Sequence, residues 1–441
     1  MNSKMMFAIV AVGIIVIAGV GAVILINNGS SDKDTRTYGN RLMVFGNANG
    51  DDYIDSDDVS KLESIISDIE NGGQWDKDAN PYADANQDGT IDSNDVEFVK
   101  RMVKREAMKI YFVDTDMRVR SVDYPVKTVA GITTVTLEGL SVLDVESKVV
   151  ARHGTNNAMD SIRFQPYLDL PTVGKSTAKA KCLDITMISN VSQNISGGID
   201  AVVTRSGYIT EDQESQLNEL GISLIRMGFA SMNTEQGSYL TLGYLMEAEE
   251  RSHEVVKFLD EIEAYADSIV ETIPADKRPT VLCTAGNAVG PNVYVDTEWH
   301  VKAGATNNVT PAMIDGSTGG KHIQEGEVWQ YGSDFIAQYN VNATTFNYDC
   351  DEQEVIDAWT TLKTYFGEGD YYPTHCAILN KAVPPAICVI YLMEFYYPDK
   401  VPAGTADGYM QKYVNELMGV KDFDVTKHPF FVTYDDVKDK L

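Results

Sequence analysis

Two short stretches rich in Asp and Asn carry side chains in the order that a calcium ion requires. Calcium takes six to eight hard oxygen ligands, and a twelve-residue loop supplies them from positions 1, 3, 5, 7, 9 and 12. Residues 47–58, NANGDDYIDSDD, and residues 84–95, DANQDGTIDSND, place oxygen-bearing groups at all of these positions. The expected ligands are Asn47, Asn49, Asp51, the Tyr53 carbonyl, Asp55 and Asp58 in the first loop, and Asp84, Asn86, Asp88, the Thr90 carbonyl, Asp92 and Asp95 in the second loop.

The two loops are expected to differ in calcium affinity. Gly89 stands at position 6 of the second loop, where the chain must turn sharply, and Asp52 stands there in the first loop. A left-handed backbone at Asp52 would be strained, because glycine alone adopts that conformation at little cost. Position 1 is the neutral Asn47 in the first loop and the charged Asp84 in the second. We therefore expect two calcium sites, of which the second binds more tightly.

Each loop runs into apolar residues at helical spacing, and no comparably convincing helix precedes either loop. The repeated unit is therefore a loop followed by a helix. The apolar positions are Val59, Leu62, Ile65 and Ile69 after the first loop, and Val96, Val99 and Met102 after the second.

The terminal Asp at position 12 and the missing entering helix distinguish dockerin repeats from EF-hands, and residues 42–105 closely resemble a type I dockerin. The resemblance implies a small all-α module with two EF-hand-like calcium loops, which docks onto a cohesin module of another surface protein. In that family the contacts come from loop positions 10 and 11 and from basic residues of the following helix. The matching residues here are Ser56, Asp57, Ser93, Asn94, Lys100 and Arg101. The first repeat lacks the basic pair, so two interchangeable docking faces are not expected.

The composition argues against nucleic acid as a partner. A chain of 441 residues with 44% hydrophobic and 23% charged residues is long enough for two or three globular domains. Its formal net charge of −29 opposes phosphate binding, which needs clustered Lys and Arg.

The five cysteines are scattered and form no CxxC pair, which argues against a zinc site. A disulfide between Cys376 and Cys388 is one alternative, and burial as free thiols is the favoured one.

The N-terminal segment predicts a membrane anchor. Residues 5–26, MMFAIVAVGIIVIAGVGAVILI, form an uninterrupted apolar run that is long enough to cross a bilayer. Lys4 precedes the run, so the positive-inside tendency places the bulk of the chain outside the cell. The alternative is a cleaved signal peptide, whose apolar region is normally shorter. We expect a single-pass anchor in the cell membrane over residues 1–26, followed by a polar linker over residues 27–40.

From about residue 108 the chain alternates between short strand-like runs and helical stretches. This alternation predicts βαβ units with a mainly parallel sheet. The expected strands lie within residues 109–113, 128–132, 148–154, 198–205, 221–229, 280–286 and 334–340.

A long helical pattern between Tyr239 and Ile273 stands out in this region, and Pro274 ends it. A single helix of roughly 30 residues would span about 45 Å, which suits a strut between two lobes. Its apolar positions are Val255, Leu259, Ile262, Ala266, Ile269 and Ile273.

Residues 108–441 resemble the two-lobed substrate-binding proteins of iron–siderophore, haem and cobalamin ABC importers. The resemblance rests on the order of DTDMRVRSVDYPVKTVAGI, SKVVARHG, GIDAVVTRSG, QLNELGISLIRMG, KRPTVLC, GEVWQYGSDFIAQYN and YLMEFYYPD. It implies two α/β lobes joined by one long helix. The resulting division is a dockerin over residues 41–106, a first lobe over 107–235, a linking helix over 236–275 and a second lobe over 276–441.

Ligands of open α/β sheets lie beyond the carboxyl ends of the strands. Three arginines at such ends would suit an anionic chelate through charge-assisted hydrogen bonds, and Trp299 would stack on a flat ligand. The candidate ligand-binding residues are Arg152, His153, Arg205, Tyr208, Arg226, Asn287, Trp299, His300 and Tyr339.

The importer resemblance also implies one acidic docking residue per lobe for an ABC permease, and the matching positions are Asp184 and either Glu325 or Glu327. The expected function is a membrane-anchored receptor, not an enzyme, for an iron chelate, haem or a corrinoid. Two alternatives stay open: a dockerin-borne glycoside hydrolase acting on polysaccharide, and an adhesion protein. No G-x-S-x-G, H-E-x-x-H or Walker-type loop occurs.

Overall fold

The structure is a computed structural model that describes residues 41–154, 159–175, 181–287, 290–293, 298–309, 321–322, 330–339, 348, 351–366, 376–379 and 383–441. The chain forms two compact units. The first unit comprises the described residues up to Glu106 together with Ile110–Val119, and the second comprises Ala107–Lys109 and Arg120–Leu441.

The first unit contains the two loop–helix repeats that the sequence predicts. Helix α1 (Ser56–Glu70) follows the first loop, and helix α2 (Ser93–Val103) follows the second. Asp55 and Asp92 cap the two helices, each within a capping box that satisfies backbone N–H groups of the first turn. The apolar stripes face inward, with Leu62, Ile65, Val96, Val99 and Met102 buried.

The first unit also contains a short antiparallel pairing that involves strand β1 (Met108–Val113). Residues 42–45 run antiparallel to β1, where Phe45 donates its N–H to the Tyr111 carbonyl at 2.9 Å. Val113 in turn donates its N–H to the Met43 carbonyl at 2.9 Å. Phe45 and Tyr82 meet edge to face in the same buried cluster as Val113. The core of the first unit therefore extends past the two repeats and includes part of β1.

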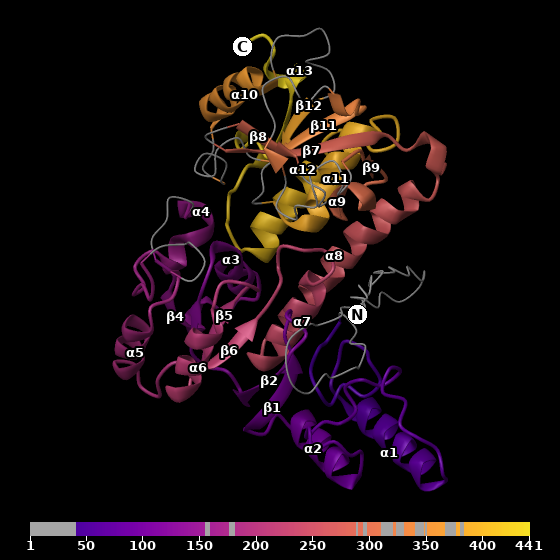
Figure 1. The fold of residues 1–441 in the computed structure, drawn as a ribbon, viewed down its shortest axis with the longest axis vertical. Coiled ribbons are helices and arrows are strands. Elements are labelled where there is room, and N and C mark those ends of the chain that lie inside the picture. Colours follow the sequence, from indigo (N-terminus) through magenta and orange to yellow (C-terminus); the bar gives the residue numbers. More distant parts are fainter. Residues whose placement is uncertain are drawn as a thin grey trace, which may run out of the picture. The chain divides into compact units, whose positions relative to one another are not determined.

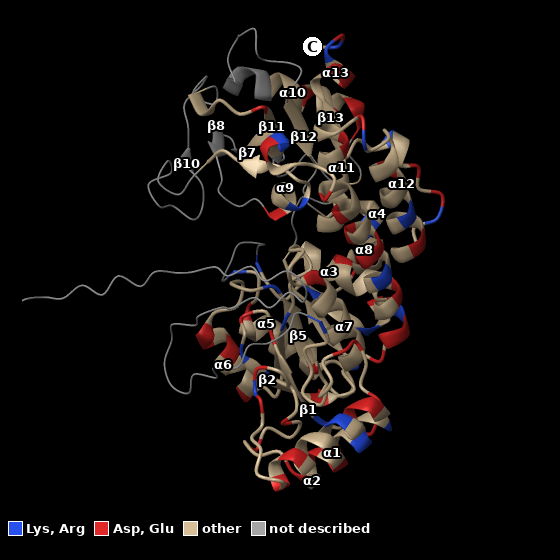
Figure 2. Cartoon of the chain, turned by 90° about the vertical axis from the view of Figure 1, so that its right-hand side faces the viewer, with Lys and Arg blue, Asp and Glu red and all other residues tan. Residues whose placement is uncertain are grey.

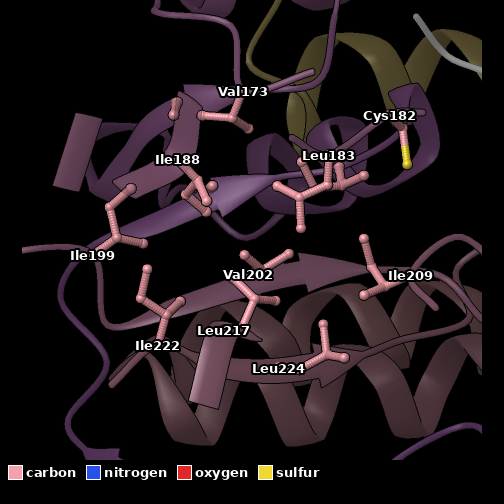
Figure 3. Close-up of a cluster of buried hydrophobic side chains, with 13 residues drawn as sticks. Val173, Cys182, Leu183, Ile188, Ile199, Val202, Ile209, Leu217, Ile222 and Leu224 are labelled. Carbon is pink, nitrogen blue, oxygen red and sulfur yellow. The ribbon is translucent and has the colours of Figure 1, made fainter. Parts of the chain in front are cut away.

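The first lobe of the second unit is built on a four-stranded parallel sheet of order β4-β3-β5-β6. Its strands are β3 (Val129–Gly131), β4 (Val149–Arg152), β5 (Ala201–Thr204) and β6 (Ser223–Arg226), and β2 (Val119–Tyr124) precedes them. Its helices are α3 (Thr134–Val142), α4 (Ser161–Phe164), α5 (Ile185–Gln193) and α6 (Glu211–Glu219), with short 3₁₀ turns at Glu146–Lys148 and Gln165–Tyr167. Strand and helix residues such as Ile188, Val202 and Leu217 share one buried cluster (Figure 3). The predicted parallel βαβ arrangement is confirmed in this lobe.

Two helices occupy the stretch in which the sequence pattern predicts one. Helix α7 (Glu235–Leu245) ends in a turn where Glu247 has a left-handed φ of 55°, and Ala248 donates its N–H to the Gly243 carbonyl at 2.7 Å. Helix α8 (Glu249–Val270) then runs for 22 residues, or about 33 Å, from one lobe to the other (Figure 1). Asp and Glu positions, coloured red, recur along α8 (Figure 2), while its predicted apolar stripe is buried at Val255, Leu259, Ile262 and Ala266.

The second lobe is built on a seven-stranded sheet of order β10-β8-β7-β11-β12-β13, with β9 paired to β7. Strands β7 (Thr280–Asn287), β11 (Phe335–Tyr339) and β12 (Cys376–Leu379) are parallel, as is β9 (Thr306–Asn307) to β7. Strands β8 (Gly290–Val293), β10 (Lys321–His322) and β13 (Phe431–Thr433) are added antiparallel. The helical segments are Ala275–Lys277, α9 (Glu298–Lys302), α10 (Glu352–Phe366), α11 (Pro385–Tyr396), α12 (Thr405–Lys412), a π-helical turn η6 (Tyr413–Leu417), Val425–Lys427 and α13 (Tyr434–Val437).

Four cysteines are described, and all four are buried free thiols. The alternative disulfide between Cys376 and Cys388 is therefore wrong, and the favoured expectation of free thiols is confirmed for these residues. Cys350 lies outside the described residues.

The predicted transmembrane helix and single-pass membrane location are corrected. Within the described ranges, no helix combines the length and the apolar character that crossing a bilayer demands. Helix α11 is apolar but has 12 residues, and α8 has 22 residues but carries many charges, whereas a span needs about 20 apolar residues. Residues 5–26, on which the prediction rested, lie outside the described residues.

Candidate functional site

The two predicted calcium loops share one hydrogen-bonding scaffold around their last residue. In the first loop, Asn49 and Asp55 donate their backbone N–H groups to the two carboxylate oxygens of Asp58 at 3.2 and 3.0 Å. In the second loop, Asn86 and Asp92 donate to Asp95 at the same two distances. The side chain at position 12, in the first turn of each helix, therefore connects the loop backbone to that helix through two hydrogen bonds.

The chemistry of the two loops fits a hard divalent cation. Asp58 and Asp95 are fully buried, and this burial raises the pKa of each carboxyl to about 6. A bound cation would offset the cost of burying these charges. In the parts of the chain that the structure describes, no three His, Cys, Asp or Glu side chains are gathered around one point as a metal-binding group. The fit therefore rests on the oxygen donors at the six loop positions and on the two buried carboxyls.

The backbone of the first loop turns differently from that of the second. The expected strain at Asp52 does not arise, because the positive φ lies at Gly50 (77°) and not at position 6. In the second loop, Gln87 (58°) and Gly89 (91°) both have positive φ. The position 8 residues, Ile54 and Ile91, are buried in both loops.

The predicted cohesin-docking residues lie on the surface of the first unit. Ser56, Asp57, Ser93 and Asn94 are exposed at the starts of α1 and α2. On α2, Lys100 is half-buried and pairs with Glu97 at 2.9 Å, and the exposed Arg101 pairs with Glu106 at 2.9 Å. The docking role itself stays a prediction.

Two of the three predicted ligand arginines are engaged in the first lobe itself. Arg152 at the end of β4 is buried and donates from Nε to the Tyr167 carbonyl at 2.9 Å and from Nη2 to the Leu168 carbonyl at 3.0 Å. Arg226 at the end of β6 is also buried and pairs with Glu214 at 2.8 Å. Arg120 also pairs with Glu214. Burial alone would raise the pKa of Glu214, but the hydrogen bond from Arg226 and the two guanidinium charges hold it below its usual value.

Arg205 and His153 differ in their exposure to solvent. Arg205 follows β5, is partly exposed and lies over the Tyr208 ring at 5.6 Å. His153 follows β4 and is fully buried; burial lowers its pKa, so its ring is neutral near pH 7. Its Nδ1 lies 2.6 Å from the Gly154 carbonyl, and its Nε2 has no hydrogen-bond partner among the described residues. The neutral ring with Nδ1–H therefore leaves an acceptor lone pair on Nε2.

The second-lobe candidates lie on three different elements. Asn287 and Tyr339 lie at the carboxyl ends of the parallel strands β7 and β11. Trp299 is half-buried in α9, and its neighbour His300 is fully buried, with Nδ1 2.7 Å from the Tyr396 hydroxyl. Burial lowers the pKa of His300 to about 3. In this conformation His300 is a neutral core residue.

The predicted permease-docking residues are described in part. Asp184 caps α5 by accepting the N–H groups of Thr186 and Met187, and it pairs with Lys175 at 2.9 Å. The hydrogen bond from Lys175 holds the pKa of Asp184 below its usual range. Glu325 and Glu327 lie outside the described residues.

Sequence reasoning missed the carboxylates that join the two lobes. Glu298 in α9 accepts hydrogen bonds from Ser231, Met232 and Asn233, which follow β6. Glu138 in α3 accepts a hydrogen bond from the Tyr413 hydroxyl at 3.0 Å, across 275 residues of sequence. No local sequence pattern marks either residue, because each partner is distant along the chain.

Comparisons with known proteins agree with both resemblances. Residues 46–104 match the family model of the dockerin type I domain. No curated protein matches the chain by sequence. The fold resembles a periplasmic solute binding protein from Veillonella parvula DSM 2008, at 13% identity and a TM-score of 0.53, covering 72% of this chain and 95% of that one.

Two further solved structures show the same fold. One is the TroA-like periplasmic binding protein FepB from Veillonella parvula, at 16% identity and a TM-score of 0.52, covering 73% of this chain and 99% of that one. The other is the molybdate periplasmic binding protein MolA of Haemophilus influenzae, at 14% identity and a TM-score of 0.52, covering 70% and 98%. The chain thus combines a type I dockerin with the fold of periplasmic solute-binding proteins.

Proposed function

We propose that this chain is a solute-binding protein of an ABC importer that carries a docking module, and that it is not an enzyme. The observation that carries the proposal is the pair of α/β lobes joined by α8. Arg205 and His153 directly follow parallel strands in one lobe, and Asn287 and Tyr339 end parallel strands in the other. Ligands of such sheets bind beyond these strand ends.

The proposed ligand is an anionic metal chelate: an iron–siderophore, haem or a corrinoid. Arg205 supplies a partly exposed positive charge with its guanidinium over Tyr208. His153 is a buried neutral imidazole whose Nε2 has no hydrogen-bond partner among the described residues. Arg152 and Arg226, by contrast, bind carbonyl and carboxylate oxygens of the first lobe itself.

Thermal unfolding of the full chain with ferric siderophores, haem and cobalamin tests this function. A ligand present at one hundred times its dissociation constant adds about 2.7 kcal/mol to the unfolding free energy. Arg205→Gln should weaken that ligand-dependent gain, and Lys257→Gln, at an exposed position of α8, should not. Release of sugar from a polysaccharide, together with no shift from any chelate, would instead establish the dockerin-borne hydrolase.

The first unit is proposed to bind calcium at both loops, more tightly at the second, and to dock onto a cohesin module. Calorimetric titration of the full chain with calcium should then show two unequal binding steps. A chain that takes up no calcium would remove the proposed metal role and leave the solute-binding proposal standing.

A further inference from the structure

The two loops of the first unit can be compared position by position, because 37 residues separate each pair of equivalent positions. The first loop has three carboxylates at ligand positions, and the second loop has four. The difference lies at position 1, where Asn47 stands opposite Asp84. Since calcium affinity rises with the number of charged ligands, the second loop has the stronger electrostatic attraction for the ion.

The first loop also has a fixed positive charge beside it. The Arg41 guanidinium donates from Nε to Asp52 Oδ1 at 2.8 Å, and its Nη2 contacts the other oxygen of the same carboxylate. Both side chains are partly buried. The equivalent positions of the second repeat hold Asp78 and Gly89, which cannot form this pair. The Arg41–Asp52 pair is neutral overall, so Asp52 adds no net attraction for a calcium ion, and the pair fixes position 6 to residue 41.

The Asn47 amide closes the first loop from inside. Its Nδ2 donates to the Leu42 carbonyl at 2.9 Å and to the Asp51 carbonyl at 2.7 Å, and its Oδ1 accepts the Gly50 N–H at 3.0 Å. The side chain is buried. In the second loop, Asp84 Oδ2 accepts the Gly89 N–H at 3.1 Å and the Asp84 carbonyl accepts the Gln87 amide at 2.5 Å. A carboxylate has no N–H to donate, so the Asp84 side chain cannot bridge two carbonyls as Asn47 does.

We propose that Arg41 and Asn47 hold the first loop closed without a metal, so that calcium controls the docking module through the second loop. The inference rests on the proposed calcium role of this unit and adds its regulation. The first loop binds calcium at least about tenfold more weakly than the second, because it has one carboxylate fewer at its ligand positions. The second loop leads into α2, which carries Lys100 and Arg101, so this face responds to calcium at concentrations that leave the first loop empty.

Terbium luminescence separates the loops, because a tyrosine sensitises emission from a terbium ion bound close to it. Tyr53 stands at position 7 of the first loop, and Thr90 stands there in the second. The emission that depends on Tyr53 is identified by its loss in the variant Tyr53→Phe, and it reports terbium bound in the first loop. In the full chain this emission should appear only at terbium concentrations well above those that fill the second loop. In the variant Arg41→Gln/Asn47→Asp/Asp52→Gly, this emission should move to concentrations at least about tenfold lower. Lys61→Gln, which removes one positive charge from α1, should leave it unchanged.

The proposal is overturned if the Tyr53-dependent emission appears first in the native chain, or if the triple substitution leaves its midpoint in place. If neither loop binds terbium or calcium, the proposed calcium role fails as well. The calcium titration would then show no heat of binding. A failed proposal and a failed calcium role therefore give different results.

Hydrogen exchange of the native chain in chelator tests the metal-free closure without a variant. The N–H groups of Asp51, Tyr53 and Asp55 should stay protected, because the first loop remains closed. The equivalent N–H groups of Asp88, Thr90 and Asp92 should exchange faster in chelator than in calcium. Equal loss of protection in both loops would contradict the proposal.

Discussion

The carboxylate of Glu298 accepts the backbone N–H of Met232 at 2.9 Å, and this bond joins α9 of the second lobe to the segment that follows β6 in the first. The other carboxylate oxygen accepts the Ser231 hydroxyl at 3.1 Å and the Asn233 amide at 2.9 Å. One side chain thus receives donors from three consecutive residues. Hydrogen bonds to an ionised acceptor are stronger than neutral ones, so this contact resists separation of the lobes at this edge.

Glu298→Gln should weaken this junction. An amide offers one acceptor oxygen and turns an NH₂ group toward donors, so at least one of the three bonds is lost, at a cost of about 1–3 kcal/mol. Denaturant unfolding should show the loss, and small-angle scattering should show a larger radius of gyration if the lobes separate. Glu261→Gln, at an exposed position of α8, provides the control. Identical unfolding curves for native chain and Glu298→Gln would show that the junction adds no stability.

Substitution of Arg251 on α8 should also lower the unfolding free energy. Its Nε donates to the Val142 carbonyl at the end of α3 at 2.9 Å, and its Nη2 donates to the Glu416 and Leu417 carbonyls of η6 at 3.0 and 2.6 Å. A cation at two helix C-termini donates hydrogen bonds to carbonyls that lack partners within the helices. Its positive charge also interacts favourably with the negative ends of both helix dipoles. Arg251→Lys keeps the charge but lacks the forked donor geometry, so it should cost about 1–2 kcal/mol of unfolding free energy.

The comparison with Arg251→Met separates geometry from charge. Equal losses for the Lys and Met variants mean that the forked hydrogen bonds stabilise the junction. Full stability of the Lys variant would mean that charge alone suffices, contrary to the expectation.

The sequence predicts the elements of this chain better than it predicts their partners. Apolar spacing located α1, α2 and the strands, because periodicity is a local property of the chain. The turn between α7 and α8 escaped detection, since its left-handed residue is Glu247 and no Gly, Asn or Pro marks it.

The strand-end rule located arginines but could not say what each one binds. Arg226 lies at the carboxyl end of β6 as expected, yet its guanidinium pairs with Glu214 of α6. In a chain with 65 Asp and Glu residues, no sequence pattern selects that partner. The same limit hid Glu298, whose partners lie 65–67 residues away in the sequence.

His300 should make the protein less stable as the pH falls below neutral. Its pKa is lowered to about 3 in the folded chain, against an ordinary value of 6.5, so between these values the unfolded chain binds a proton that the folded chain does not. Stability from the neutral ring is therefore complete above pH 6.5 and is lost as the pH falls toward 3. At pH 4.5 the loss is on the order of 3 kcal/mol.

Urea unfolding of the native chain and of His300→Gln across pH 4.5–7.5 measures this contribution. The variant should be less stable at pH 7.5 but should show a smaller decline toward pH 4.5. His253→Gln on α8, which also removes an imidazole, serves as the control substitution. Parallel pH profiles for the native chain and His300→Gln would contradict the prediction.

Substitution by alanine should change the unfolding free energy in opposite directions at two glycines. At Gly174 a Cβ would lie 1.9 Å from the Cys182 carbonyl oxygen and 2.3 Å from its carbon, both of them backbone atoms that cannot move aside alone. Gly174→Ala should therefore cost about 1–3 kcal/mol, as overpacking does. Gly408 lies exposed within α12 with no atom near its Cβ position.

Gly408→Ala should raise the unfolding free energy by about 0.5–1 kcal/mol, because alanine loses less backbone entropy in a helix than glycine does. Thermal unfolding of the two variants side by side gives the test. A destabilised Gly408→Ala would mean that α12 needs glycine for a reason other than helix formation. An unaffected Gly174→Ala would mean that the backbones of Gly174 and Cys182 separate at little cost, since the added methyl group has no other room.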